Sequence, residues 1–367
     1  MNVGVVGGGQ LARMLAMAGL PLGMQFHFID PNPDCCAAPL GELIVGEYDD
    51  ARALESLARR CDVCTFDFEN VPAEAMARLQ ALGRVHPVPE ALLVAQDRLR
   101  EKEFFASAGF SLPPYRPVDS LQDLRCAAEC VGLPAVLKTR RMGYDGKGQR
   151  VLRQQADLES AWKEIGGNSL ILEGFVRFRR EVSLLVVRDQ QGRVRFWPRV
   201  ENDHRQGILH SSRVMPSPPC RHEIDARARV RQVLHRLDYV GVAAFEFFDT
   251  GTGWLLNEMA PRVHNSGHWT IEGAVTSQFE NHLRAISGLP LGETTPLGHC
   301  LMRNWVGAMP SMSACLQVPG LHWHDYHKAA RPGRKVGHAT LVAADAATLY
   351  QRERLLDQVI EDGGEAV

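Results

Sequence analysis

The feature that most constrains the fold is the regular alternation of apolar runs and amphipathic segments in the first hundred residues. The short apolar runs predict buried strands, and the longer periodic segments predict helices. Strands are expected at residues 3–6, 25–29 and 63–66, and helices at residues 10–18, 50–59 and 72–82. Because parallel strands need a crossover connection between them, this order favours a parallel, doubly wound α/β domain.

The rest of the chain mixes strands and helices less regularly. A helix is expected at residues 97–108, and Pro113 and Pro114 beyond it indicate a linker. The other expected elements are strands at residues 135–138, 169–173, 181–188 and 194–200, helices at 155–163 and 222–237, a hairpin at 241–259 with its turn at 249–253, a strand near 336–343 and a helix from 346. A length of 367 residues predicts roughly two or three domains.

Composition excludes several classes of protein. A hydrophobic content of 45% supports a packed core, and 41 basic against 43 acidic side chains argue against nucleic-acid binding by phosphate neutralisation. The N-terminus lacks the features of a signal peptide, and no apolar run approaches the roughly 18 residues of a membrane span. Cys61 and Cys64 form the only metal-like cysteine spacing, without a second pair. We expect a cytoplasmic protein with reduced thiols, no nucleic-acid partner and no membrane association.

A glycine-rich basic loop follows the predicted strand at residues 135–138. Lys138 ends that strand, and the loop then contains Arg140, Arg141, Gly143, Tyr144, Asp145, Gly146, Lys147, Gly148 and Gln149. Backbone N–H groups in such a loop can turn toward phosphate oxygens, and the cations add positive charge. An anionic polyphosphate is therefore the expected ligand. The spacing is not that of a Walker A loop, and an ordinary surface turn is the alternative.

A second glycine-rich turn joins the first strand to the first helix. Gly7, Gly9 and Ala12, with Asp30 ending the next strand, imitate the fingerprint of a dinucleotide-binding domain. The same turn would suit the phosphate of a phosphorylated sugar equally well. A nicotinamide-dependent oxidoreductase is thus the main alternative to an enzyme acting on a nucleoside triphosphate, and a catalytically silent nucleotide-binding protein is a third.

The predicted hairpin carries two carboxylates. If Phe248 pairs with Trp254 across the turn, Glu246 faces Leu256 and lies diagonal to Glu258 on the same sheet face. Carboxylates this close repel each other unless a positive group lies between them, and Mg²⁺ bridging nucleotide phosphates is the usual solution. Two solvated surface glutamates are the alternative, although neighbouring phenylalanines favour burial.

Two further segments are candidates for ligand contacts. Residues 257–270 carry eight polar side chains among fourteen, so this stretch either lies exposed or lines a polar site. Residues 173–176, with Glu181 opening the next strand, are compatible with a hinge that offers backbone groups to a purine edge and a carboxylate to ribose hydroxyls.

A basic stretch lies near the C-terminus. Lys328, Arg331, Arg334 and Lys335 put four cations into eight residues. This pattern indicates either a solvated basic turn or a clamp for a monophosphate, to which arginine would give forked contacts.

Together these motifs resemble the ATP-grasp enzymes, and within them the N5-carboxyaminoimidazole ribonucleotide synthases of purine biosynthesis. The resemblance covers essentially the whole chain, and its most specific motifs are residues 7–11, 68–72, 97–98 with 101–102, 143–149, 257–270 and 331–338. It implies an α/β (overall α+β) architecture with a Rossmann-like N-terminal domain at 1–96, a central two-subdomain ATP-grasp domain at 97–297 and a small β-rich C-terminal domain at 298–367. It also implies a homodimer.

The resemblance implies that ATP, with Mg²⁺ as cofactor, lies between the two central subdomains. Glu246 and Glu258 would bind the Mg²⁺. The implied ATP-binding residues are Arg98, Lys138, Gly143, Tyr144, Asp145, Gly146, Lys147, Gly148, Gln149, Glu173, Gly174, Phe175, Val176, Glu181, His204, Asn257 and Glu258.

The implied reaction joins 5-aminoimidazole ribonucleotide, bicarbonate and ATP, and gives the N5-carbamate, ADP and phosphate by way of carboxyphosphate. Asp145 would orient or deprotonate the exocyclic amine, and Arg262 would steady bicarbonate or carboxyphosphate. The implied catalytic residues are Tyr144, Asp145, Arg262, His264 and Lys335. The implied substrate-binding residues are Gln10, Leu11, Tyr144, Asp145, Arg262, His264, Asn265, Ser266, Lys328, Arg331, Arg334 and Lys335.

Four positions bear on how specific the resemblance is. Ala12 stands where glycine is common, Asp67 where glutamate is usual, and Lys147 where arginine is common, which keeps the charge but loses its fork. Ala260 occupies a position that is asparagine in many ATP-grasp ligases but alanine in this family, which favours the specific assignment.

Overall fold

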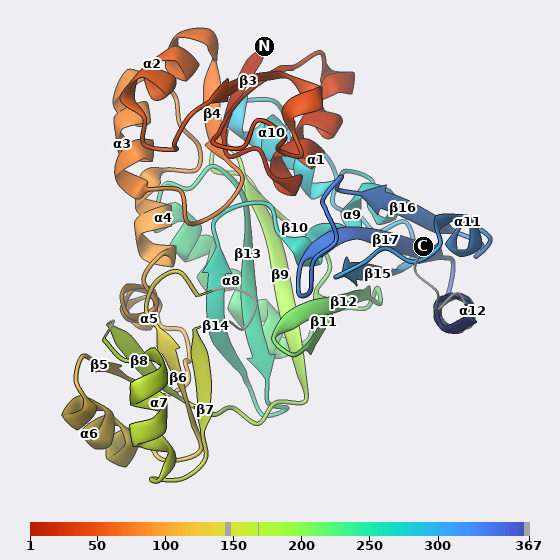
Figure 1. The fold of residues 1–367 in the computed structure, drawn as a ribbon. Coiled ribbons are helices and arrows are strands. Elements are labelled where there is room, and N and C mark those ends of the chain that lie inside the picture. The colour runs from red at the N-terminus through yellow and green to blue at the C-terminus, as the bar shows by residue number, and fades with distance from the viewer. Residues whose placement is uncertain (144–147, 168, 363–367) are drawn as a thin grey trace.

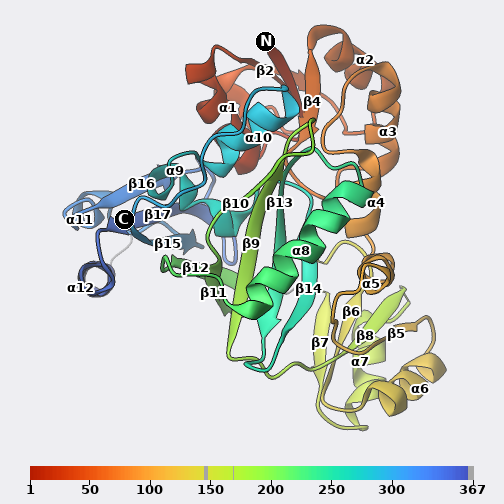
Figure 2. The same ribbon diagram turned by 180° about the vertical axis from the view of Figure 1, so that it is seen from behind.

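The computed structural model describes residues 1–143, 148–167 and 169–362, and Figures 1 and 2 show it from opposite sides. Its N-terminal part is a parallel sheet with strands in the order β3-β2-β1-β4. The elements are β1 (Asn2–Val6), α1 (Gln10–Gly19), η1 (Leu20–Leu22), β2 (Gln25–Asp30), η2 (Ala38–Leu40), β3 (Glu42–Val45), α2 (Ala51–Arg60), β4 (Val63–Phe66), α3 (Ala73–Leu82) and α4 (Pro89–Ala95). This confirms the predicted doubly wound order, although the half-exposed edge strand β3 and the short helix α4 were not predicted.

A smaller antiparallel sheet follows the helix α5 (Arg98–Ser107). Its strands lie in the order β5-β8-β6-β7, and α6 and α7 pack their apolar side chains against it. The elements are β5 (Tyr115–Val118), α6 (Leu121–Val131), β6 (Ala135–Thr139), β7 (Gln149–Leu152), α7 (Asp157–Ile165) and β8 (Leu170–Gly174). In both views α5 lies between this sheet and the N-terminal part (Figures 1 and 2).

The remaining strands form one large sheet that runs from the centre into the C-terminal part. Its order is β14-β13-β9-β11-β12-β15-β17-β16, with β10 paired to β9. The central elements are β9 (Arg180–Arg188), β10 (Val194–Phe196), β11 (Val200–Arg205), β12 (Ile208–Val214), α8 (Arg221–Arg236), β13 (Gly241–Asp249), β14 (Trp254–Ala260), η3 (Asn265–Gly267), α9 (Thr270–Gly273) and α10 (Gln278–Ile286). The C-terminal elements are β15 (His299–Val306), α11 (Met312–Cys315), β16 (Leu321–Asp325), β17 (Lys335–Ala343) and α12 (Ala346–Asp362).

The single strand predicted at residues 194–200 is wrong. The structure has two strands there, β10 and β11, separated by Trp197, Pro198 and Arg199. Proline has no N–H to donate to a sheet ladder, so the strand ends before it. Trp197 is fully buried at this break, and its indole N–H donates to the Thr276 carbonyl at 3.1 Å.

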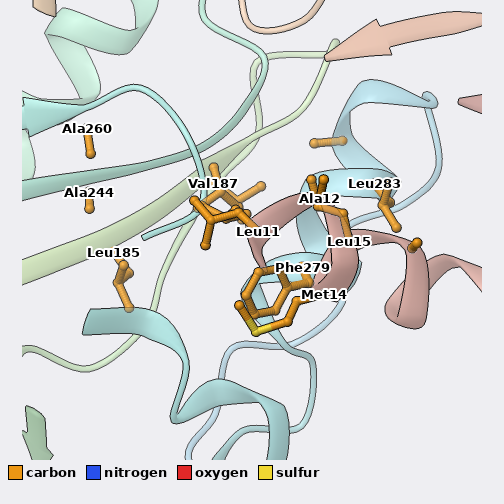
Figure 3. Close-up of a cluster of buried hydrophobic side chains, with 14 of the residues drawn as sticks. Leu11, Ala12, Met14, Leu15, Leu185, Val187, Ala244, Ala260, Phe279 and Leu283 are labelled. Carbon is orange, nitrogen blue, oxygen red and sulfur yellow. The ribbon is translucent and has the colours of Figure 1, made fainter. Parts of the chain in front are cut away.

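The N-terminal part is fixed to the centre by an apolar contact between α1 and α10. Figure 3 shows Leu11 and Leu15 of α1 beside Phe279 and Leu283 of α10, and all four side chains are buried in one cluster with Val187 of β9. Burial of these apolar side chains stabilises the contact between α1 and α10. The glycine-rich turn that precedes α1 is therefore held against the large sheet.

Two expectations about the chain as a whole can be compared with the structure. Across the described ranges, none of the helices combines the length and apolarity that crossing a membrane requires. All nine cysteines have free thiols, and Cys61 and Cys64 form no disulfide.

Candidate active site

The β13–β14 hairpin brings its two glutamates directly opposite each other. Its turn is closed by the Thr250 N–H, which donates to the Gly253 carbonyl at 3.0 Å, so Asp249 pairs with Trp254. The predicted pairing of Phe248 with Trp254 is therefore wrong by one residue. Phe247 pairs with Leu256. Between Phe247 and the preceding residue the register shifts by one, so that Glu246 pairs with Glu258. Asn257 is the extra residue of a β-bulge, and a bulge of this kind re-aims side chains.

The two carboxylates differ sharply in their surroundings. An Arg98 Nη1 lies 2.9 Å from Glu258 Oε2, and His264 Nε2 lies 3.5 Å from Glu246 Oε1. Burial, together with the charge of Glu258, raises the pKa of Glu246 to about 7. Burial also acts to raise the pKa of Glu258, but Arg98 outweighs it and lowers that pKa to about 2. Below neutral pH the pair therefore tends to hold one proton, which a bound cation would displace.

Three cations and a buried carboxylate form the next group. Lys138 Nζ donates to Glu173 Oε2 at 2.9 Å, and Lys102 Nζ lies 3.5 Å from the same oxygen. Burial acts to raise the pKa of Glu173, but Lys102 and Lys138 lower it to about 2. The charge of Arg98 lowers the pKa of Glu173 as well, to a smaller extent than the two lysines. Lys102 was not among the predicted site residues, although its spacing of four residues from Arg98 places both on one helix face.

The glycine-rich basic loop is only partly described. Arg140, which follows β6, makes a forked contact to Asp97 at 3.0 and 2.8 Å, so its charge is directed at the start of α5. Gly148 has a φ of +71°, and a Cβ there would lie 2.6 Å from Thr139 Oγ1. Gln149 begins β7 and pairs with Lys138 of β6. Gly143 is the last described residue before position 144. The predicted site residues Tyr144, Asp145, Gly146 and Lys147 lie outside the described residues.

The segment predicted as a nucleotide hinge lies at the end of β8. The N–H groups of Gly174 and Phe175 donate to the carbonyls of Pro114 and Pro134, at 2.8 and 3.1 Å. The Phe175 side chain is exposed and the Val176 side chain is half-buried. Two of the four residues of the predicted hinge, 173–176, therefore use their N–H groups to bind the loops that precede β5 and β6.

Glu181 and His204 lie beside the hairpin carboxylates. His204 Nδ1 is 3.0 Å from Glu181 Oε2. Glu181, His204 and Glu246 each offer one ligand atom, and these atoms lie within 4.8 Å of one another, so the three residues could hold a metal ion. Burial acts to lower the pKa of His204, but Glu181 and Glu246 raise it. No local sequence pattern predicts that these three residues meet, because they come from β9, β11 and β13. The family resemblance alone implies that all three belong to the nucleotide site.

The glycine-rich turn of the N-terminal part is filled by the protein's own carboxylates. The Gly8 N–H donates to Asp30 Oδ2 at 2.8 Å, and the Gly9 N–H donates to Asp67 Oδ2 at 2.6 Å. A Cβ on Gly7, whose φ is +105°, would lie 2.1 Å from Asp67 Oδ1. A dinucleotide needs these N–H groups for its pyrophosphate, which the two carboxylates would repel. The geometry therefore disfavours the dinucleotide interpretation.

The predicted ribonucleotide residues gather between this turn and the end of β14. Lys328 Nζ donates to Gln10 Oε1, and the Arg262 guanidinium pairs with Glu69. Burial acts to raise the pKa of Asp67, to about 7, against the opposing charges of Arg262 and Lys328. Side chains from both ends of the chain thus meet at this point.

His264 lies between the two groups of charged side chains. Burial, with the nearby Arg262 and Lys335, lowers the pKa of His264 to about 3, so its imidazole is neutral. Its Nδ1 lies 2.8 Å from the Ser266 hydroxyl. Asn265, the next residue, donates to Asn304 Oδ1 of β15 at 3.0 Å.

Three predicted substrate residues lie apart from these contacts. The Leu11 side chain packs in the apolar cluster of Figure 3. Arg331 is exposed, and Arg334 Nη1 donates to the Ala329 carbonyl at 3.3 Å within its own turn. Their substrate contacts stay predictions.

Comparison with known proteins then identifies the family. Residues 103–279 match the ATP-grasp domain, residues 1–96 the ribonucleotide synthetase preATP-grasp domain, and residues 300–352 the phosphoribosylaminoimidazole carboxylase C-terminal domain. N5-carboxyaminoimidazole ribonucleotide synthase from Pseudomonas aeruginosa is 54% identical over 361 residues, which span 98% of this chain and 100% of that protein. The chain belongs to the N5-carboxyaminoimidazole ribonucleotide synthase family.

Solved structures of this family agree with the fold. N5-carboxyaminoimidazole ribonucleotide synthetase from Thermus thermophilus has a TM-score of 0.93 and 51% identity, over 98% of each chain. The Aspergillus clavatus enzyme, in complex with ADP and 5-aminoimidazole ribonucleotide, has a TM-score of 0.90 and 28% identity, also over 98% of each chain. The predicted fold class, an ATP-grasp protein with a Rossmann-like N-terminal part, is confirmed.

Proposed function

We propose that this chain is an ATP-dependent carbon–nitrogen ligase that carboxylates the exocyclic amine of 5-aminoimidazole ribonucleotide, with release of ADP and phosphate. The observation that carries the proposal is the meeting of two anion-binding groups at the end of β14. Arg98 of α5 forms an ion pair with Glu258, which lies within β14. Arg262 follows this strand and pairs with Glu69 of the N-terminal part. Family membership supports the same activity, since the relatives are synthases of N5-carboxyaminoimidazole ribonucleotide.

A divalent cation fits the residues of the hairpin. The carboxylates of Glu246 and Glu258 stand opposite each other, and Asn257 Oδ1 is buried without a hydrogen-bond partner among the described residues. Oxygen donors of this kind suit a hard cation, and we propose Mg²⁺. When bound with ATP, the ion would neutralise charge on the phosphates. Glu181 and His204 would contact the nucleotide beside it.

The chemistry balances as one displacement at phosphorus, one fragmentation and one addition to CO₂. A bicarbonate oxygen attacks the γ-phosphorus, the bond to the β,γ-bridging oxygen breaks, and ADP leaves. The resulting carboxyphosphate splits into CO₂ and phosphate, and the amine nitrogen then attacks the CO₂ carbon and loses one proton to give the carbamate. Holding the phosphates and excluding water from carboxyphosphate are the main demands on the protein.

The protein's own groups meet these demands by exchange of partners. Arg98 and Lys138 are neutralised here by Glu258 and Glu173, so the arrival of triphosphate and cation would exchange one set of charge contacts for another. Arg262 would steady bicarbonate or carboxyphosphate. Lys328 would bind the 5′-phosphate of the ribonucleotide beside Gln10.

Compartment and assembly are part of the proposal. Nine free thiols agree with a reducing cytoplasm. Met17, Leu20 and Leu22 expose apolar side chains in succession on α1 and η1, and a surface of this kind favours a contact between protein chains. We propose a homodimer, which sedimentation velocity would distinguish from a monomer.

Transfer of oxygen from bicarbonate to phosphate tests the proposed route. The enzyme is given Mg·ATP, the ribonucleotide and bicarbonate fully labelled with ¹⁸O, and the phosphate is analysed by mass spectrometry after a short reaction. Formation of carboxyphosphate predicts one ¹⁸O atom in each phosphate released. Unlabelled phosphate, formed together with ADP, would mean that water and not bicarbonate attacks ATP.

A further inference from the structure

Helix α5 contacts three consecutive residues of β14 through three side chains. The bonds run from Lys102 Nζ to the Asn257 carbonyl (2.8 Å), from Arg98 Nη1 to Glu258 Oε2 (2.9 Å) and from the Met259 N–H to Glu101 Oε1 (2.7 Å). The spacing of positions 98, 101 and 102 places all three side chains on one helix face. Arg98 is a predicted ATP contact, whereas neither Glu101 nor Lys102 has a role in the proposed reaction so far.

The two additional side chains meet β14 where its backbone most needs partners. β14 is the edge strand of the large sheet, with β13 as its neighbour, and the bulge at Asn257 interrupts the ladder between them. Backbone groups at a buried edge require partners from outside the sheet. Glu101 and Lys102 supply them, and both are buried, with 2% and 0% of their surface exposed.

The start of α5 is itself fixed. Asp97 accepts hydrogen bonds from the N–H groups of Leu99 and Arg100, at 3.0 and 3.3 Å, which is the geometry of an N-terminal cap. The same carboxylate receives the forked contact from Arg140 of the small sheet. The helix is therefore a rigid support, anchored on one side by the small sheet and on the other by β14.

We propose that Glu101 and Lys102 are positioning residues, which hold the peptide groups on both sides of Glu258 so that its carboxylate stays opposite that of Glu246. This inference rests on the proposed function, because it assigns a purpose to the cation site. Side chains that orient metal ligands without touching the metal affect affinity by about 10–100-fold when they are removed.

Lys102 adds a link between the two sheets of the central part. Its Nζ bonds to the Asn257 carbonyl of β14 and lies 3.5 Å from Glu173 Oε2 of β8. One buried ammonium group thus connects the hairpin with the strand that leads to the predicted nucleotide hinge.

Binding of Mn²⁺, as a probe for the cation, tests the proposal. Mn²⁺ is titrated into the full chain with saturating ADP, and the free ion is followed by electron paramagnetic resonance. Glu101→Leu, which removes the acceptor of the Met259 N–H, is expected to raise the dissociation constant of Mn²⁺ by about 10–100-fold. Glu101→Gln keeps an acceptor oxygen and is expected to stay within about threefold of the parent, as is Glu103→Leu, an exposed control on the same helix.

The outcomes separate the inference from the proposed function. Equal Mn²⁺ affinity in the parent and in a folded Glu101→Leu variant, with only the melting temperature lowered, would overturn the positioning role. A parent chain that binds no Mn²⁺ with ADP would overturn the cation site itself, and the inference with it. If Glu101→Leu fails to fold, Glu101→Asp and Lys102→Met take its place, with the same loss of affinity expected and the same equality refuting it.

Discussion

Replacing Glu246 by glutamine is predicted to stabilise the metal-free protein at alkaline pH. The carboxyl of Glu246 ionises near 4.5 in the unfolded chain, and burial beside Glu258 raises its pKa to about 7 in the folded protein. Between these two values the folded state binds more protons than the unfolded state. The free energy of unfolding therefore falls as the pH rises through this window, by about 3 kcal/mol in total.

Glutamine does not titrate, so the variant escapes this loss. Relative to the parent, its free energy of unfolding is expected to rise by about 2–3 kcal/mol between pH 5 and pH 8, since only about a fifth of the window lies below pH 5. Urea unfolding with a chelator present, at both pH values, measures the change. The exposed Glu103→Gln provides the control and is expected to show no such dependence. A difference between Glu246→Gln and the parent that is the same at both pH values would refute the reasoning.

Three further predictions concern other parts of the site and core. Gln278→Leu removes the amide that bonds both the N–H and the carbonyl of His264, at 2.9 and 2.7 Å, and is expected to lower the free energy of unfolding in urea by about 2–4 kcal/mol. Lys328→Met is expected to raise the KM for the ribonucleotide at least about tenfold, because a phosphate loses its charged partner, while calorimetry finds ADP affinity unchanged; equal effects on both ligands would contradict this. Phe279→Ala opens a cavity between α1 and α10 and is expected to cost about 3–5 kcal/mol in thermal unfolding, and a loss below 1 kcal/mol would show that the contact is not packed as described.

The elements that could be predicted from the sequence are those with strong local signals. The strand at residues 3–6 is a continuous apolar run, and the strand at 63–66 is apolar except for Thr65. The helix at 97–108 begins with Asp97, which caps α5. Edge strand β3 escaped prediction because its apolar run, Leu43 to Val45, is only three residues long, which is too short for a clear strand signal.

The parts of the site that escaped prediction depend on contacts between distant segments. The bulge at Asn257 has no local sequence signal, yet it decides which residue faces Glu246. The Gly7 turn fits a dinucleotide in sequence, and only the fold places Asp67 against it. Lys102 is a charged residue on a helix, which usually lies in solvent, and its burial follows from β14 and β8 packing against α5.

The measurement that tests the central claim most directly is ADP release from Mg·ATP, with and without 5-aminoimidazole ribonucleotide. It is made first in buffer stripped of CO₂ and then after bicarbonate has been restored. A carboxylating ligase predicts rapid ADP release only when ribonucleotide and bicarbonate are both present. Equal release without either of them, or no release under any of these conditions, would contradict the proposed function.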